Sequence, residues 1–299
     1  MTRALVLGGG GPVGIAWEAG LLAGLAEGGV DLAEADYILG TSAGSFVGSQ
    51  LAMGKPAAEI AKSILAEADR PRPAPPPVDG QPAEARAAPN LGALMVMMQQ
   101  ARSGARDPQV VRQEIGAFAL AAQTVDEETF IKGFGRQLSE SQADVWPQRG
   151  FACTAVDAES GEFVIWDAAA KVGLARAVAS SCAVPGVFPP IALNGRRYID
   201  GGMRSATNAD LATGHELVVV VAIRLGVDPA ISAQMQAPLE AELQVLRDGG
   251  ARVELILPDD ASVAAFGVNL MDGRVRPAAC AAGVEQGRAL AATLKAAWG

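Results

Sequence analysis

The chain has 299 residues, half of them hydrophobic, which is enough apolar material for the core of a large α/β domain and excludes a wholly disordered chain. There are 24 lysines and arginines against 33 aspartates and glutamates, so the formal net charge is −9. Such an acidic balance argues against a nucleic-acid partner and against a general attraction to anionic membranes.

The cysteines and the apolar stretches exclude further classes of protein. Cys153, Cys182 and Cys280 are widely spaced and have no histidine neighbours, so neither a disulfide framework nor a zinc site is expected. The longest aliphatic stretch, Leu217 to Ile223, is far shorter than the ~18 residues of a membrane-spanning helix. The first residues lack the pattern of a signal peptide. We therefore expect a cytoplasmic α/β protein that needs no metal and no cofactor.

The first predicted elements are a strand, a glycine-rich loop and a helix. Arg3 to Leu7 is a short apolar run that ends in four consecutive glycines, and Pro12 stands where the first turn of a helix tolerates proline. After it, large and small residues recur every four positions on separate stripes, which is typical of a helix packed closely on a sheet. The large stripe is Trp17, Leu21 and Leu25, and the small one is Ala16, Gly20 and Gly24.

A second strand, Tyr37 to Leu39, leads into a G-x-S-x-G sequence, Gly40 to Gly44, and a predicted helix follows to about Gly54. In such a motif the serine occupies a sharp strand-to-helix turn with strained backbone angles, and the flanking glycines let strand and helix pass closely. The helix N-terminus beside the serine favours developing negative charge. Ser42 is therefore the candidate nucleophile, and a plain tight turn is the alternative interpretation of the motif alone.

The glycine-rich loop has two chemical interpretations. Gly9-x-Gly11-x-x-Gly14 satisfies the motif of dinucleotide-binding folds, which predicts a nucleotide-binding oxidoreductase. That fold also needs an acidic residue at the end of the second strand, where this chain has the G-x-S-x-G sequence instead. In the other interpretation, the backbone amides of Gly9, Gly10 and Gly11 form an oxyanion hole beside Ser42.

Composition changes between Asp69 and Asn90, where seven of the 18 prolines lie from Pro71 to Pro89. This predicts a solvated loop or linker. It does not separate independent domains, because the downstream part supplies the remaining strands. We expect one domain over residues 1–299, in which residues 69–145 form a proline-rich loop and an inserted helical cap or lid.

Three helical patterns follow the proline-rich segment. They cover Leu91 to Met98, Val111 to Ala122 and Phe130 to Leu138, and a capping-box pattern from Thr124 to Glu127 precedes the third. The run from Met95 to Met98 fits either a peripheral contact with a membrane or an ordinary packed helix.

Strands return in the second half of the chain. The predicted strands are Phe151 to Val156, Glu162 to Trp166, Ile191 to Leu193, Arg196 to Ile199, Leu217 to Ile223 and Val253 to Leu257, with helices over Leu174 to Ser181 and Ala278 to Trp298. Asn194-Gly195 between two of these strands is a strong hairpin signal. Asp200-Gly201-Gly202 directly follows the second strand of that hairpin.

The proton acceptor for Ser42 is either Asp200 or the single histidine, His215. The order of the three residues agrees with the α/β-hydrolase triad. Against that triad, Ser42 follows only two strands and His215 immediately precedes a buried strand. Asp200 ends a strand and is followed by two glycines that permit close approach. We therefore expect Asp200 to take the serine proton directly and His215 to be structural.

The order of the glycine-rich loop, the G-x-S-x-G motif, the segment Ala179 to Pro185 and Asp200-Gly-Gly resembles the patatin-like phospholipases. The resemblance covers the chain from Arg3 to about Ile223 and is weak over Asp69 to Asp144. It implies a three-layer α/β/α fold with a mostly parallel central sheet.

The resemblance also implies a function and a site. It implies hydrolysis of lipid acyl esters by a Ser42–Asp200 dyad without a metal, with the amides of Gly9 to Gly11 as oxyanion hole. A lipid or another acyl ester is then the substrate. Val13 stands where the family usually has arginine, which leaves a catalytically silent lipid-binding protein as a further alternative. The oligomeric state is not indicated by any of these residues.

Overall fold

The computed structural model describes residues 1–69, 105–138, 144–224 and 229–298, together with residues 94, 96–98 and 100. The chain forms two compact units, and each is described by itself. The first comprises Met1–Asp69, Pro147–Ala152 and Ser205–Gly299, and the second comprises Arg70–Trp146 and Cys153–Arg204.

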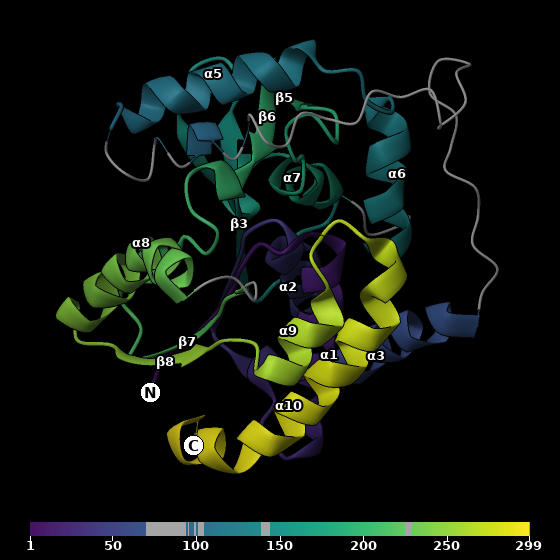
Figure 1. Ribbon diagram of the computed structural model, residues 1–299, viewed down its shortest axis with the longest axis vertical. Coiled ribbons are helices and arrows are strands. Elements are labelled where there is room, and N and C mark those ends of the chain that lie inside the picture. The colour runs from purple at the N-terminus through teal and green to yellow at the C-terminus, as the bar shows by residue number, and fades with distance from the viewer. Residues whose placement is uncertain are drawn as a thin grey trace. The chain divides into compact units, whose positions relative to one another are not determined.

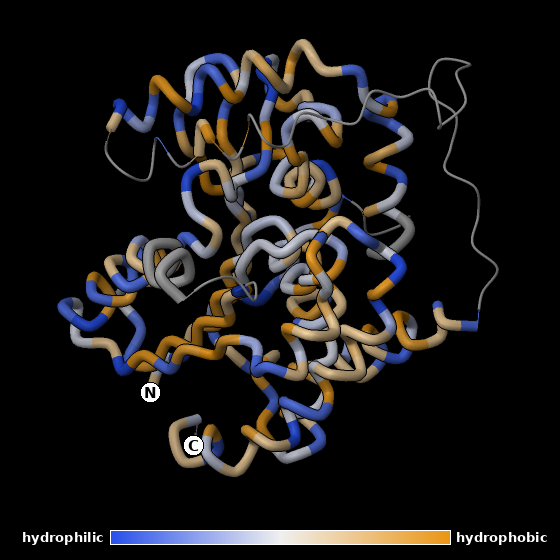
Figure 2. Tube along the Cα trace, viewed as in Figure 1, coloured by the Kyte–Doolittle hydropathy of each residue, from blue (hydrophilic) through white to orange (hydrophobic). Residues whose placement is uncertain are grey.

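The first unit contains a parallel sheet. Its strands lie in the order β2 (Tyr37–Gly40), β1 (Arg3–Leu7), β7 (Leu217–Val221) and β8 (Arg252–Ile256), and β3 (Gly150–Asp157) begins beside β2. Leu7 lies opposite both Gly40 and Val221, so the carboxyl ends of these three strands align at one edge. The loops that follow β1 and β2 therefore begin side by side. β7 is buried and hydrophobic along its whole length, as predicted for a central parallel strand (Figure 2).

Helices cover both faces of this sheet. α8 (Pro229–Asp248) packs Leu243 and Leu246 against Val218 and Val220 of β7 on one face. On the other face, Leu7 lies against α2 (Ala43–Ala52). The remaining helices of the unit are α1 (Gly11–Glu27), α3 (Ala57–Leu65), α9 (Asp260–Phe266) and α10 (Arg276–Trp298). The predicted α/β class, with a parallel sheet flanked by helices, is confirmed.

α1 is buried on nearly all sides because α10 runs alongside it (Figure 1). The small stripe of α1 faces this helix and not the sheet. A Cβ atom on Gly20 would lie 2.1 Å from the carbonyl oxygen of Cys280, and one on Gly24 would lie 2.1 Å from that of Val284. The glycines are therefore required by the close approach of two helix backbones.

The second unit is built on antiparallel strands. β5 (Ile191–Leu193), β6 (Arg196–Asp200), the rest of β3 and β4 (Phe163–Trp166) pair in that order. Asn194 and Gly195 both have positive φ angles, 50° and 79°, which confirms the predicted hairpin. The helices are α5 (Pro108–Ala121), α6 (Glu127–Leu138) and α7 (Leu174–Ser181). Val111 and Ile115 of α5 pack on Val156 and Ile199 of the sheet.

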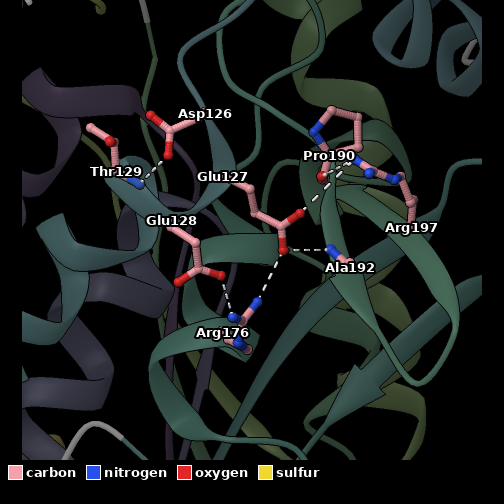
Figure 3. Close-up of polar contacts among 8 residues, drawn as sticks. All are labelled: Asp126, Glu127, Glu128, Thr129, Arg176, Pro190, Ala192 and Arg197. Carbon is pink, nitrogen blue, oxygen red and sulfur yellow. Dashed lines mark hydrogen bonds and ion pairs between the residues drawn. The ribbon is translucent and has the colours of Figure 1, made fainter.

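The start of α6 differs from the predicted capping box. The backbone amide of Thr129 donates to the Asp126 carboxylate at 2.9 Å, so Asp126 caps the helix and Thr124 does not. The Glu127 carboxylate turns away and accepts hydrogen bonds of 3.0 Å from Arg176 of α7 and from the backbone amide of Ala192 (Figure 3). Through these hydrogen bonds the Glu127 carboxylate connects α6 with α7 and with the β5–β6 hairpin.

The inserted segment is described only in part. The prediction for Pro71 to Pro89, and most of that for Leu91 to Met98, falls outside the described residues. Met97 and Met98 pack against the core beneath α5, while Val96 is 54% exposed. Among the helices that the structure describes, none is long and apolar enough to cross a membrane.

Candidate active site

Ser42 occupies the strained strand-to-helix turn that the motif predicts. It lies between the end of β2 and the first residue of α2, with φ 52° and ψ −115°. Within the described part of the chain it is one of four non-glycine residues with positive φ. Such a conformation costs on the order of 1–3 kcal/mol and persists only where the surrounding structure enforces it. The side chain is 7% exposed, so the hydroxyl group is held in a mostly buried position.

The two glycines that flank the turn are required because neighbouring atoms leave no room for a Cβ atom, and not because of their backbone angles. A Cβ atom on Gly40 would lie 2.4 Å from the Cα atom of Ser45, and one on Gly44 would lie 2.1 Å from the carbonyl oxygen of Leu7. The amide of Gly44 also donates to the carbonyl oxygen of Gly8 at 2.9 Å. The G-x-S-x-G turn is thereby locked against the glycine-rich loop.

The glycine-rich loop lies directly beside the nucleophile, but its three candidate amides are not equivalent. A Cβ atom on Gly9 would lie 3.4 Å from the Cβ atom of Ser42. The amide of Gly9, however, donates to the carbonyl oxygen of Ala206 at 2.7 Å. The expected role of Gly9 as an oxyanion donor is therefore corrected: Gly9 fixes the loop and permits its close approach to Ser42.

The amides of Gly10 and Gly11 remain candidates for the oxyanion hole. Neither amide makes a hydrogen bond within the residues that the structure describes, and Gly11 is the first residue of α1. The amide of Ala43, the first residue of α2, is likewise without a partner among them. The sequence analysis did not single out Ala43, although the residue after the nucleophile commonly contributes to the hole. The N-termini of two helices thus lie next to Ser42, where both favour negative charge.

A polar network behind the turn was also missed. The Asn208 side-chain amide donates to Thr41 Oγ1 at 3.1 Å and to the carbonyl oxygen of Ser205 at 2.8 Å. Glu242 of α8 accepts a hydrogen bond of 2.6 Å from the Thr207 hydroxyl group and one of 2.8 Å from the backbone amide of Ala209. Asn208 is fully buried and has φ 51°, a left-handed conformation that asparagine tolerates better than most residues. The network fixes the residue before Ser42 and the segment that holds Gly9.

Asp200 is the last residue of β6, in the second unit, and is 2% exposed. Its carboxylate accepts a hydrogen bond of 2.7 Å from the amide of Gly202, and its own amide donates to Ala183 at 3.0 Å. A Cβ atom on Gly201 would lie 2.1 Å from Thr154 Oγ1, so the close turn after Asp200 requires glycine. Ser42 and the glycine-rich loop belong to the first unit, and the pairing of Ser42 with Asp200 stays a prediction.

His215 lies at the wrong end of the sheet to act on Ser42. It precedes β7, stacks on Tyr37 with ring centroids 5.4 Å apart, and has Nδ1 3.3 Å from the carbonyl oxygen of Ala212. The start of β7 aligns with the start of β1, whereas Ser42 follows the carboxyl end of β2. Five strand residues span about 16 Å at about 3.3 Å each. This separation supports a structural role for His215.

The buried thiols are poor competitors for the role of nucleophile. Burial raises the pKa of Cys280 to about 12 and raises the pKa of Cys153 further still. Since the thiolate is the reactive form of cysteine, both groups are inert near neutral pH.

A model of the family described as Patatin-like phospholipase matches residues 5–213, which is more than two thirds of the chain. The chain belongs to this family. The match includes the glycine-rich loop, Ser42 and Asp200, so the patatin-like resemblance predicted from the motifs is confirmed. Membership supports a lipid hydrolase and gives no support to the nucleotide-binding alternative.

Two solved structures are similar to this patatin-like chain at low sequence identity. VipD from Legionella pneumophila has 16% identity and a TM-score of 0.47, with 98% of this chain and 67% of that chain covered. The type III effector protein ExoU has 16% identity and a TM-score of 0.40, with 98% of this chain and 53% of that chain covered. The chain therefore spans about two thirds of the first protein and about half of the second. No curated protein matches the sequence.

Proposed function

We propose that this patatin-like protein is a serine acyl hydrolase that cleaves acyl esters of lipids. The observation that carries the proposal is the strained backbone of Ser42 beside the amides of Gly10 and Gly11, which have no hydrogen-bond partner in the part of the chain that the structure describes. Backbone strain at a nucleophile and amides without an internal partner both lower stability. An ester substrate accounts for both, because the serine attacks its carbonyl carbon and the amides bind its oxyanion. The family match supports lipids as the substrate class.

In the proposed mechanism, Ser42 Oγ attacks the ester carbonyl carbon while the Asp200 carboxylate takes the hydroxyl proton. The amides of Gly10 and Gly11 bind the resulting oxyanion, assisted by the N-termini of α1 and α2. As the intermediate collapses, Asp200 returns the proton to the departing alcohol and leaves an acyl-serine. Water then attacks the acyl-serine, again with Asp200 as base, and releases the fatty acid and the free serine.

With Asp200 as the base, the Ser42 hydroxyl proton must be transferred in concert with the attack on the ester. A free aspartate has a pKa of about 3.9, far below that of a serine hydroxyl group, so the proton moves only as the new C–O bond forms. Such a base is best matched to esters and thioesters, whose leaving groups need less help than an amine. The substrate is therefore proposed to be a phospholipid, a lysophospholipid or a simpler ester, and not an amide.

A peripheral contact with a lipid surface is a separate part of the proposal. It rests on exposed apolar residues of the second unit: Val96 at 54%, Val110 at 44% and Leu120 at 42%. Co-sedimentation with phosphatidylcholine vesicles tests it, since replacing all three with serine should then reduce the bound fraction.

Hydrolysis of p-nitrophenyl esters tests the proposed activity. Ser42→Ala should abolish turnover, because it removes the hydroxyl group that is proposed to attack the ester. Ser63→Ala, on the exposed side of α3, is the matched control and should retain the parent rate. Titration with a nicotinamide dinucleotide tests the alternative, and saturable binding at the glycine-rich loop would reject the hydrolase.

A further inference from the structure

Glu18 is a buried acid in the middle of α1. Its side chain is 0% exposed, and neither carboxyl oxygen has a hydrogen-bond partner in the described part of the chain. Among the described residues of the first unit, it is the sole acidic or basic side chain that is fully buried. Buried polar groups are nearly always hydrogen-bonded, so a partnerless carboxyl group calls for an explanation.

The location of Glu18 connects it with the glycine-rich loop. Helical side chains point toward the helix N-terminus, and residues four apart share a face, so Glu18 points toward Gly14. Gly14 has no side chain to block it, and a Cβ atom there would lie 3.3 Å from the Cβ atom of Ala43. The backbone amide of Gly8 is close enough to influence the carboxyl group. The Glu18 carboxyl group therefore lies next to the start of the glycine-rich loop.

Among the residues that the structure describes, none forms an ion pair with this carboxyl group. Burial raises the pKa of Glu18 well above its usual value, and the Gly8 amide opposes this effect only in part. The other titratable and charged side chains on the adjacent described elements are as follows. α2 carries none; α3 carries Glu59 and Lys62; the neighbouring 3-10 helices carry Glu34 and Arg274. α10 carries Arg276, Cys280, Glu285, Arg288 and Lys295.

We propose that Glu18 is a positioning residue of the acyl-transfer site: its buried carboxyl group supports the glycine-rich loop, whose Gly10 and Gly11 amides bind the oxyanion. This proposal rests on the proposed function. An uncharged acid fills the space next to the loop without adding charge there. A charged carboxylate in the same place would repel the oxyanion that the loop binds.

The cost of that repulsion can be worked out from the helix. Glu18 follows Gly11 by seven residues, which is about 10 Å at about 1.5 Å per residue. A unit charge at about 10 Å, with an effective dielectric constant of about 20, slows oxyanion formation about 10- to 20-fold. Ionisation of Glu18 should therefore produce a loss of kcat on the alkaline side of the pH profile.

Three variants separate a positioning role from a merely structural one. Glu18→Gln keeps the shape and polarity of the side chain but cannot ionise, and Glu18→Leu removes the polar group. Glu27→Gln is the control, because Glu27 is on the same helix but is exposed and paired with Arg288. Each variant is assayed for kcat and KM between pH 5 and pH 9, and for stability by urea unfolding at pH 8.

We expect Glu18→Leu to be more stable than the parent at pH 8 but to lose about tenfold or more in kcat, with KM little changed. Glu18→Gln should restore most of the lost kcat and should lack the alkaline decline. Glu27→Gln should follow the parent in every measurement. If Glu18→Leu does not fold, the pH profile of Glu18→Gln decides alone.

The proposal is overturned if Glu18→Leu is as active as the parent, or if Glu18→Gln keeps the parent's alkaline decline. Failure of the proposed function is distinct from this result. It would appear as a parent protein whose ester hydrolysis is absent or is unaffected by Ser42→Ala. The stability measurement does not depend on activity. If the parent and the Glu18→Leu variant are equally stable at pH 8, the assignment of Glu18 as a buried, uncharged group is wrong as well.

Discussion

Replacing Asn208 with alanine should destabilise the protein and slow catalysis together. The change removes the hydrogen bonds to Thr41 Oγ1 and to the Ser205 carbonyl oxygen, each worth about 1 kcal/mol net. It also places alanine at φ 51°, which costs about 1 kcal/mol more. The total is about 3 kcal/mol. With an unfolding entropy of about 2.1 cal/mol/K per residue over 299 residues, this lowers Tm by about 5 °C.

The assay combines urea unfolding with ester hydrolysis. Since Thr41 directly precedes Ser42, loosening it should lower kcat more than it raises KM. Asn208→Gly is the matched control, because glycine tolerates the left-handed conformation and should be about 1 kcal/mol less destabilised than the alanine variant. An alanine variant within about 0.5 kcal/mol of the parent and with the parent kcat would refute the role assigned to the network.

Three further predictions concern the base, the buried acid and the turn. Asp200→Asn should lower kcat by about 10³-fold or more, whereas His215→Ala should stay within a few-fold of the parent; equal inactivity of both folded variants would reject the dyad. Because the folded state raises the pKa of Glu18, its contribution to stability is fully present below the unfolded pKa of about 4.3 and is lost as pH rises toward the folded pKa. Urea unfolding at several pH values should show this loss in the parent and not in the Glu18→Leu variant. Gly44→Ala places a Cβ atom 2.1 Å from a backbone oxygen and should cost about 3 kcal/mol or prevent folding, while Gly133→Ala, with nothing within 4 Å, should be neutral or stabilising by thermal unfolding.

The features predicted correctly are those that depend on neighbours in the sequence. The strand, glycine loop and helix at the N-terminus follow from local apolar runs and a proline at a helix start. The strained turn at Ser42 follows from glycines two residues on either side. The Asn194-Gly195 hairpin is equally local, because the two residues adopt the positive φ angles that such a turn requires.

The features that were missed depend on contacts between distant residues. The amide of Gly9 is engaged by Ala206, almost two hundred residues later, and no local pattern reports that contact. The two stripes of α1 predict close packing on a sheet, but the small stripe packs against α10, because spacing reveals a close approach and not the partner that approaches. α8 was not predicted, since Pro238 interrupts it and its apolar residues form only a weak stripe. Asp126 caps α6 in place of Thr124, a difference of two residues that composition does not resolve.

The central claim is that Ser42 is the nucleophile of an acyl hydrolase. Labelling the protein with a fluorophosphonate probe, followed by peptide mapping, tests it most directly, because the probe reacts only with an activated serine. The account predicts a single labelled peptide that carries the probe on Ser42 and that disappears in the folded Ser42→Ala variant. A probe attached to another serine, or an unlabelled but folded parent protein, would contradict it.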